Sequence, residues 1–352
     1  MNVSSQGLGS AIQILLERLL RLRAGENLLL YRDQGSDPSM ADAIRLHAER
    51  IGARIDCLEL DDDLALADLA RGIAEKIRSG RFDAVCELST KYFYRTEVSR
   101  AVRDVGARVY WLPGLDRTAF IRCLGTVDHE RMFAFGVALR GVLREGKRIR
   151  VLTDRGTDLR MQIGLARTSR YVARVIGRRR PHVSMPTGLL KASKRFSFLG
   201  GQLSFQALAD TIEGTAAVDG YLWPPAEIGR LDNPILLVIE RGRVVRIGGS
   251  GSQPKVLLRW FGEEEISIEH FCIGFHPSAG LSGGIMEAER AFGCISIGMG
   301  KGIRHTDGVM TRPTIEMDHG RLEDRGSFTY EKLSRLEQEL LQGQPELANN
   351  GY

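Results

Sequence analysis

The strongest constraint on the fold is a regular alternation of short apolar runs and longer amphipathic stretches through the first 150 residues. The apolar runs, which predict strands, cover residues 27–31, 54–60, 84–88, 108–112 and 148–153. The amphipathic stretches, which predict helices, cover residues 38–51, 64–79, 95–105 and 129–144. Strands that alternate with helices pair in parallel, because each helix returns the chain to the same edge of the sheet. We therefore predict an α/β domain with a Rossmann-like parallel sheet over residues 1–147.

Glycine-rich loops that bind nucleotides are missing from this half. The segment "YRDQGSD" after the first predicted strand contains one glycine, and the half has no P-loop. A later segment, "GMGKG" (298–302), resembles a dinucleotide-binding loop, but no strand–helix–strand unit follows it. We interpret that segment as a turn.

The pattern changes after residue 147, where glycine becomes frequent and short β-rich segments replace the long helices. "LLVIERGRVVRI" (236–247) predicts two strands around a tight Arg-Gly turn, and "TIEMDHGRLED" (314–324) predicts another hairpin. An amphipathic helix and a polar tail end the chain. Residues 148–352 are therefore predicted to form a β-rich α+β domain, which is also our candidate for the catalytic metal-binding domain.

Length and composition agree with this division. A chain of 352 residues is long for a single core, and its charged fraction of 26% is ordinary for a globular protein. No apolar run reaches the roughly 20 residues that cross a bilayer. The N-terminal stretch reads as an amphipathic helix without an export signal. We predict a cytoplasmic protein with no membrane partner, whose five cysteines are reduced thiols.

The net charge of +5 raises the question of an acidic partner. The densest basic cluster consists of Arg174, Arg178, Arg179 and Arg180, and Tyr171 is the only aromatic residue near it. A nucleic-acid site usually interleaves aromatic residues or follows one helix face. We predict no nucleic-acid partner and interpret the cluster as a solvated loop or one that faces an anionic substrate.

A candidate metal site begins with the sequence His305-Thr306-Asp307. On a strand, residues i and i+2 point to the same face, so His305 and Asp307 could both reach one metal ion. Such a pair alone is often only a hydrogen-bonded surface couple. His270 lies in the apolar run "ISIEHFCIG", where an unpaired imidazole would be costly. Two histidines and one carboxylate leave open coordination positions, as in non-heme Fe(II) oxygenases.

Several segments in the second half resemble the family of thermophilic aminopeptidase T-like metalloenzymes. "RIRVLTDRGTDLRMQIG" (148–164) resembles the GTDL segment of that family, and "GRLDNPILLVIERGRVVRIGG" resembles the hairpin that follows it. "EHFCIGFHPSAG" and the stretch from "GGIMEAERAFG" to "HTDGVMTRPTIEMDHG" resemble the metal-binding region. The resemblance is specific between residues 148 and 320 and looser before them.

The ligand pattern departs from that of the two-metal peptidases. Gln202, Ala291 and Ser296 stand at positions where the resemblance would place Glu, Glu and His, and His270 stands where the peptidases have Glu. The remaining set of His270, His305 and Asp307 is similar to that of the 2,5-dihydroxypyridine 5,6-dioxygenases, which bind Fe(II). The resemblance therefore implies one metal per chain, Fe(II) with Mn or Zn as alternatives.

The dioxygenases also use a histidine after the third N-terminal strand, whereas this chain has "ELSTKYFYR" there. We take Glu87, Ser89 and Lys91 as candidate catalytic residues. The candidate substrate-binding residues are Thr90, His182 and Glu269.

These observations lead to a ranked set of functions. We expect a mononuclear non-heme Fe(II) dioxygenase that opens the ring of a small hydroxylated aromatic or N-heterocycle, with O2 as second substrate. A mononuclear metal-dependent hydrolase of an amide or aryl amine is the alternative, with Glu269, Glu287 or Glu289 as base. A binding protein that lost catalysis is the third hypothesis. The resemblance also suggests a homo-oligomer.

Overall fold

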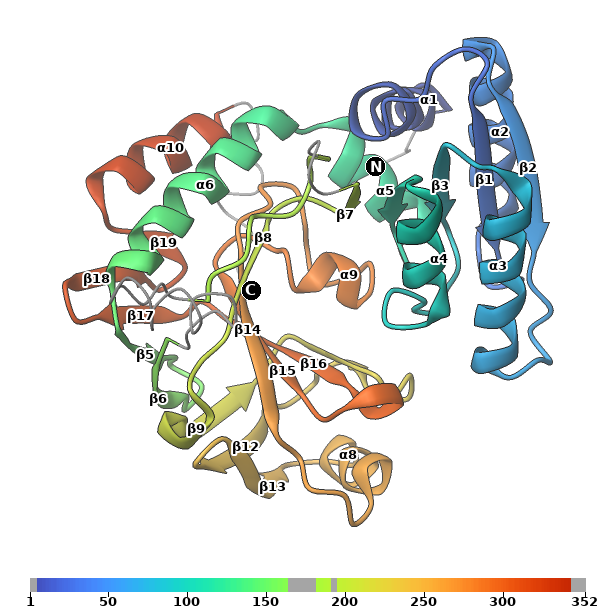
Figure 1. Cartoon of the computed structure of the whole chain (residues 1–352). Coiled ribbons are helices and arrows are strands. Elements are labelled where there is room, and N and C mark those ends of the chain that lie inside the picture. Colours follow the sequence, from blue (N-terminus) through green and yellow to red (C-terminus); the bar gives the residue numbers. More distant parts are fainter. Residues whose placement is uncertain (1–4, 164–181, 191–194, 343–352) are drawn as a thin grey trace, which may run out of the picture. The chain divides into compact units, whose positions relative to one another are not determined.

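The computed structural model describes residues 5–163, 182–190 and 195–342 (Figure 1). The chain divides into two compact units, one of Met1–His129 with Thr187–Gly200 and the other of Glu130–Pro186 with Gly201–Tyr352. The boundary that the sequence suggested, between residues 147 and 148, falls inside the second unit. Helix α6 (His129–Glu145) accounts for the difference, because its Phe135 packs against Phe275 and Phe328 of the second unit. The arginine cluster at 174–180 lies outside the described residues.

The first unit contains a five-stranded parallel sheet in the order β2-β1-β3-β4-β7. Its strands are β1 (Asn27–Arg32), β2 (Arg54–Glu59), β3 (Ala84–Glu87), β4 (Arg108–Trp111) and β7 (Phe196–Phe198). The first four lie where the apolar runs predicted them. The predicted α/β fold of this half, with its Rossmann-like parallel sheet, is confirmed.

The helices of this unit are α1 (Ser5–Gln13) with its π-helical continuation η1 (Ile14–Leu19), α2 (Pro38–Ile51), α3 (Leu66–Gly80), α4 (Glu97–Val105) and α5 (Arg117–Gly125). Helix α2 has the predicted bounds because both of its ends are capped. The Asp37 side chain accepts a hydrogen bond from the Ser39 amide, and Gly52 ends the helix with φ of 85°. Helix α5 was not predicted.

The last apolar run of the first half does not join the parallel sheet. It forms β5 (Arg148–Leu152), which pairs antiparallel with β6 (Asp158–Gln162) and β17 (Thr314–Met317) in the second unit. Buried and less buried residues alternate along β5, whereas four consecutive residues of β1 are buried. Alternation is typical of an antiparallel strand with one face toward the core, and a continuous buried run is typical of a parallel strand covered on both faces.

The second unit contains two larger sheets. The eight-stranded sheet has the order β13-β12-β9-β6-β5-β17-β18-β19, and the six-stranded sheet has the order β11-β10-β16-β15-β14-β8. The strands of the second sheet are β8 (Gln202–Phe205), β10 (Tyr221–Trp223), β11 (Gly229–Arg230), β14 (Ile268–Gly274), β15 (Cys294–Met299) and β16 (Thr306–Thr311). A β-carbon on Gly308 of β16 would lie 3.0 Å from Val218 of β9 (Glu213–Val218), so one face of the six-stranded sheet packs toward the other sheet.

Both predicted hairpins are confirmed. Strands β12 (Ile235–Glu240) and β13 (Arg243–Gly249) form the first, and β17 with β18 (Gly320–Asp324) forms the second. The remaining elements are β19 (Ser327–Phe328), the 3-10 turn η2 (Ala209–Thr211) and the helices α8 (Gln253–Phe261), α9 (Ile285–Ala288) and α10 (Glu331–Leu341). In the described part of the chain, every helix is too short or too polar to span a membrane.

Candidate metal centre

Strand register brings two of the predicted ligands onto one face of the six-stranded sheet. His270 of β14 pairs with Gly298 of β15, and Gly298 pairs with Asp307 of β16. Residues directly opposite one another in antiparallel strands project to the same face. His270 and Asp307 therefore flank Gly298, which has no side chain to separate them.

Gly298 has a specific steric role in this row. A β-carbon built on Gly298 would lie 2.3 Å from Cε1 of His270 and 2.7 Å from both ring nitrogens. The His270 imidazole thus occupies the space that any other side chain at position 298 would fill. The prediction of a turn at 298–302 was wrong for Gly298, because β15 continues to Met299 and the 3-10 turn η3 (Gly302–Arg304) starts later.

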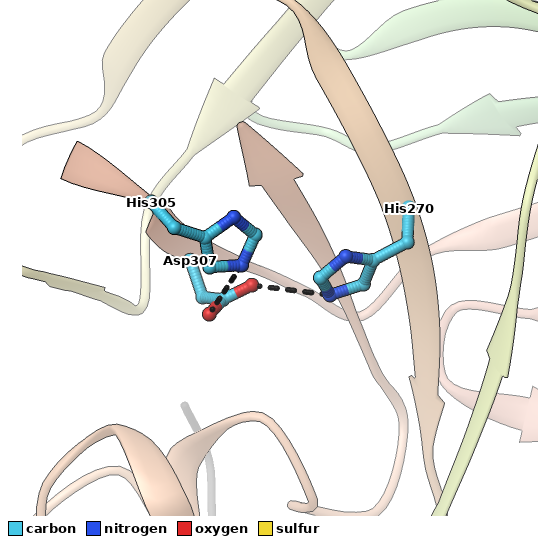
Figure 2. A group of neighbouring side chains, drawn as sticks. All are labelled: His270, His305 and Asp307. Atoms are coloured by element: carbon cyan, nitrogen blue, oxygen red, sulfur yellow. Dashed lines mark ion pairs between the residues drawn. The ribbon is translucent and has the colours of Figure 1, made fainter. Parts of the chain in front are cut away.

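The three predicted ligands converge (Figure 2). His305 lies directly before β16, and its Nε2 is 3.3 Å from Oδ2 of Asp307. The Nε2 atom of His270 is 3.3 Å from Oδ1 of the same carboxylate. The two imidazoles are stacked, with ring centroids 5.2 Å apart and planes at 22°. One ligand atom from each residue lies within 4.8 Å of the others, so the group could hold one metal ion.

Two further observations are compatible with a bound metal ion. Oδ1 of Asp307 is buried and has no hydrogen-bond partner of good geometry among the described residues. Nδ1 of His305 is 3.4 Å from the carbonyl oxygen of Gly300, which accepts a hydrogen bond when Nδ1 carries the ring proton. That tautomer leaves the Nε2 lone pair directed at the carboxylate, as a metal-binding histidine requires.

The electrostatics of the group favour a bound cation. Burial by itself raises the pKa of the Asp307 carboxyl, but His305 and His270 outweigh burial and hold this pKa far below its ordinary value. Burial lowers the pKa of His270, yet Cys272 and Asp307 outweigh it, so that pKa is raised. The site therefore holds a partly buried carboxylate that attracts positive charge, either protons or a metal ion.

A buried ion pair is formed just after helix α9. Arg290 is 1% exposed, and its guanidinium donates hydrogen bonds to Glu289, to the carbonyl of Met286 at 2.7 Å and to Oε1 of Gln202 at 3.2 Å. Burial raises the pKa of Glu289, the Arg290 charge opposes this effect, and the charges of Asp307 and His270 also act on it. The charges of two predicted ligands therefore influence the ionisation of Glu289.

The other two candidates for a hydrolytic base, Glu287 and Glu269, form hydrogen bonds with nearby loop and strand residues. Glu287 is fully buried, and its two carboxylate oxygens accept hydrogen bonds from the amides of Gly280 at 2.8 Å and Gly283 at 2.7 Å. These bonds hold the loop before α9. Glu269 accepts a hydrogen bond from Ser267 at 3.4 Å.

His182 lies in the second unit beside the six-stranded sheet. The adjacent Val183 forms a bridge with Phe205 of β8, and Phe205 pairs with Phe271 of β14. The carbonyl of His182 accepts a hydrogen bond from the Gln206 amide at 3.1 Å. The segment that contains His182 therefore lies beside β8, and β8 separates it from β14, the strand that carries His270. The role of His182 in substrate binding stays a prediction.

Glu87 is the last residue of strand β3 in the first unit, and Ser89, Thr90 and Lys91 follow it. Ser89 donates hydrogen bonds to Glu87 at 3.3 Å and to the carbonyl of Lys91 at 2.8 Å. Burial raises the pKa of Glu87 well above its ordinary value, although hydrogen bonds from Tyr31 and Ser89 oppose the shift. The catalytic roles proposed for these residues stay predictions.

Two aspartates that the sequence interpretation overlooked organise this network. Asp33 is fully buried, and one of its carboxylate oxygens accepts hydrogen bonds from both the amide and the hydroxyl of Thr90 at 2.7 Å. Asp62 forms an ion pair with Lys91, whose Nζ is also 3.8 Å from Asp33. The sequence could have indicated both residues, because Asp33 follows β1 and Asp62 follows β2. The carboxyl ends of parallel strands are where α/β sheets place ligand-binding groups.

The match to known proteins is structural. Neither a protein-family profile nor a curated protein matches the chain. The structure of 2,5-dihydroxypyridine dioxygenase from Pseudomonas putida KT2440 matches with a TM-score of 0.69 at 17% identity, over 94% of this chain and 99% of that chain. Wild-type AmpT (aminopeptidase T) from Thermus thermophilus matches with a TM-score of 0.59 at 14% identity, over 92% of this chain and 99% of that chain. The chain therefore has the fold that is shared by these two enzymes, as the sequence resemblance implied.

Proposed function

We propose that this chain is a metalloenzyme that binds one metal ion through His270, His305 and Asp307. We further propose that the metal is Fe(II) and that the reaction is the O2-dependent opening of a small hydroxylated aromatic or N-heterocyclic ring. The observation that carries this proposal is the convergence of two imidazoles on one partly buried carboxylate. The nearly full-length structural match to a dioxygenase supports it at the level of the fold.

The surroundings of the triad support a single metal. Gln202, Ala291 and Ser296 offer an amide, a methyl group and a hydroxyl where a second ion would need carboxylates and imidazole. The buried guanidinium of Arg290 donates a hydrogen bond to Gln202, so a fixed positive charge already stands beside that side chain. A second cation there would be repelled, because charges interact strongly where water is excluded.

The chemistry of the ligand set suits a dioxygenase. When bound, Fe(II) with two histidines and one carboxylate supplies redox chemistry for O2 and keeps open coordination positions. The chain's own groups would orient and balance the site. The carbonyl of Gly300 orients His305, Asp307 contributes one negative charge, and Glu289 offers a carboxylate held in place by Arg290. Glu289 is thus our candidate for moving a proton to or from the substrate.

The carboxylate of Glu289 would also serve a second function, that of a metal-dependent hydrolase. A mononuclear hydrolase needs a base near the metal-activated water, and Glu289 is electrostatically coupled to Asp307 and His270. The structural match to AmpT is compatible with such an activity. A binding protein without catalysis is the third candidate, and it would retain no metal.

Metal analysis after anaerobic purification tests the proposal first, because bound iron favours the oxygenase, and zinc or manganese favours the hydrolase. The Fe(II)-loaded protein would then be assayed on hydroxypyridines and on amino- and hydroxybenzoates, with and without air. We expect O2 consumption and loss of the aromatic absorption in air alone. Equal turnover without O2, with release of ammonia or an amine, would establish the hydrolase instead.

A further inference from the structure

The row of residues that crosses the metal centre continues onto a fourth strand. Strand β10 lies next to β16, and Trp223 of β10 pairs with Asp307. His270, Gly298, Asp307 and Trp223 therefore form one transverse row on β14, β15, β16 and β10. All of these positions project to the same face, and β-carbons of directly opposite residues are roughly 5 Å apart. The indole of Trp223 thus begins beside the Asp307 carboxylate.

Strand alternation separates Trp223 from the core. Leu222, its neighbour in β10, is fully buried and pairs with Gly308, on the face that packs toward Val218. Trp223 points the other way and remains partly exposed, although a large aromatic side chain gains most from complete burial. A partly exposed indole beside a partly buried carboxylate and two imidazoles combines an apolar surface with polar groups, as ligand sites do.

The other two tryptophans are accounted for by their surroundings. Trp111 is 1% exposed in the hydrophobic core of the first unit. Trp260 donates a hydrogen bond from its indole nitrogen to Oγ1 of Thr306 at 3.0 Å. Within the described part of the chain, Trp223 has neither a ring–ring contact nor a side-chain hydrogen bond. The exposed part of its indole can therefore contact a ligand without displacing a ring or hydrogen-bond partner among the described residues.

We propose that Trp223 is the aromatic wall of the metal centre and selects a planar ring by stacking against it. This inference rests on the proposed function, because the ring must reach the metal held at Asp307. An indole extends about 6 to 7 Å from its β-carbon, so it can cover a six-membered ring bound beside the neighbouring carboxylate. The substrate class is then a planar aromatic ring with an oxygen that can bind the metal, and a saturated ring of equal size is disfavoured.

The test uses Co(II)-loaded protein under anaerobic conditions, so that binding is measured without turnover. The two probes are 3-hydroxybenzoate and 3-hydroxycyclohexanecarboxylate, which have the same substituents and charge but differ in planarity. The proteins are wild type, Trp223→Leu, Trp223→Phe and Trp260→Leu. Trp260→Leu is the matched control, because Trp260 is bonded to Thr306, which neighbours Asp307 in β16 and alternates to the opposite face of the sheet.

We expect Trp223→Leu to raise the Kd of 3-hydroxybenzoate by about 3- to 10-fold, which is the usual worth of one aromatic pair. The Kd of the saturated probe should change by less than about twofold, since leucine retains the apolar contact. Trp223→Phe should restore most of the affinity, and Trp260→Leu should match wild type. Cobalt occupancy should be the same in all four proteins.

Three results would overturn the inference. The first is equal weakening of both probes by Trp223→Leu, which would indicate a non-selective apolar surface. The second is an unchanged or absent affinity for 3-hydroxybenzoate in fully loaded protein. The third is loss of cobalt from both Trp223 variants, which would make Trp223 a support for the ligands. Failure of the dioxygenase proposal has a different signature, namely selective ring binding without O2-dependent ring opening.

Discussion

Gly298 leaves the space that the imidazole of His270 fills, since a β-carbon at position 298 would lie 2.3 Å from Cε1 of that ring. The two residues are partners across antiparallel strands, so the sheet fixes the spacing of their backbones. The candidate metal centre therefore depends on a residue with no side chain as much as on its three ligands.

The first prediction follows from this contact. Gly298→Ala should displace the His270 ring and reduce metal occupancy to near zero, with a loss of about 1–3 kcal/mol in unfolding free energy from overpacking. Metal analysis and thermal unfolding measure the two effects. Gly248→Ala in strand β13 is the control, because a β-carbon there meets no atom within 4 Å. Full metal occupancy in Gly298→Ala would show that the ring of His270 is not a ligand in this position.

The second prediction concerns the ligands themselves. His270→Ala, His305→Ala and Asp307→Ala should each abolish metal binding and activity while the protein stays folded, because two remaining ligands hold a metal ion weakly. Metal stoichiometry and the thermal midpoint are compared for the three variants. If His270 were only a core histidine, His270→Ala would lower the midpoint and leave the metal content near that of wild type.

The third prediction is a stoichiometry of one metal ion per chain. Gln202, Ala291 and Ser296 are poor ligands, and Arg290 places a buried positive charge next to Gln202. Metal analysis of protein reconstituted with excess Fe(II), Mn(II) or Zn(II) and then desalted is the measurement. Two tightly retained ions per chain would contradict both the prediction and the role assigned to Arg290.

The fourth prediction concerns pH and helix α10. Burial raises the pKa of Glu337 from 4.5 to about 7, and the same carboxylate accepts a hydrogen bond from the Phe328 amide at 2.9 Å. The folded protein therefore holds this proton more tightly than the unfolded chain does. The free energy of unfolding should fall as the pH rises from about 4.5 through about 7, by up to roughly 3 kcal/mol, and should level off above that range.

Glu337→Gln separates this effect from other titrations. The amide oxygen can still accept from Phe328, but the side chain no longer ionises, so the variant should gain stability at pH 8 and little at pH 4.5. Denaturant unfolding at the two pH values measures the difference. Some pH dependence should persist, because burial also raises the pKa of the neighbouring Glu323. Equal effects of the substitution at both pH values would rule out ionisation of Glu337 as the cause.

Much of the fold was predictable because its signals are local. The period of apolar residues predicted strands β1 to β4 and helix α2, and turn chemistry predicted the hairpin at Arg241-Gly242, where both residues have positive φ. The two-residue period of extended chain predicted that His305 and Asp307 lie together, although His305 precedes β16 and is not part of it. These inferences need only neighbouring residues, and that information is in the amino-acid sequence itself.

Other features depend on which strands become neighbours. β7 joins the parallel sheet beside β4 although a long stretch of chain separates them, and β5 leaves that sheet for an antiparallel one. The pairing of Gly298 with His270, the pairing of Trp223 with Asp307 and the coupling of Glu289 to the ligands have no local signature. Strand register is decided by the packing of whole sheets and not by any one segment. The sequence by itself determined the ligand types and most local elements, and only the tertiary structure decided what surrounds the ligands.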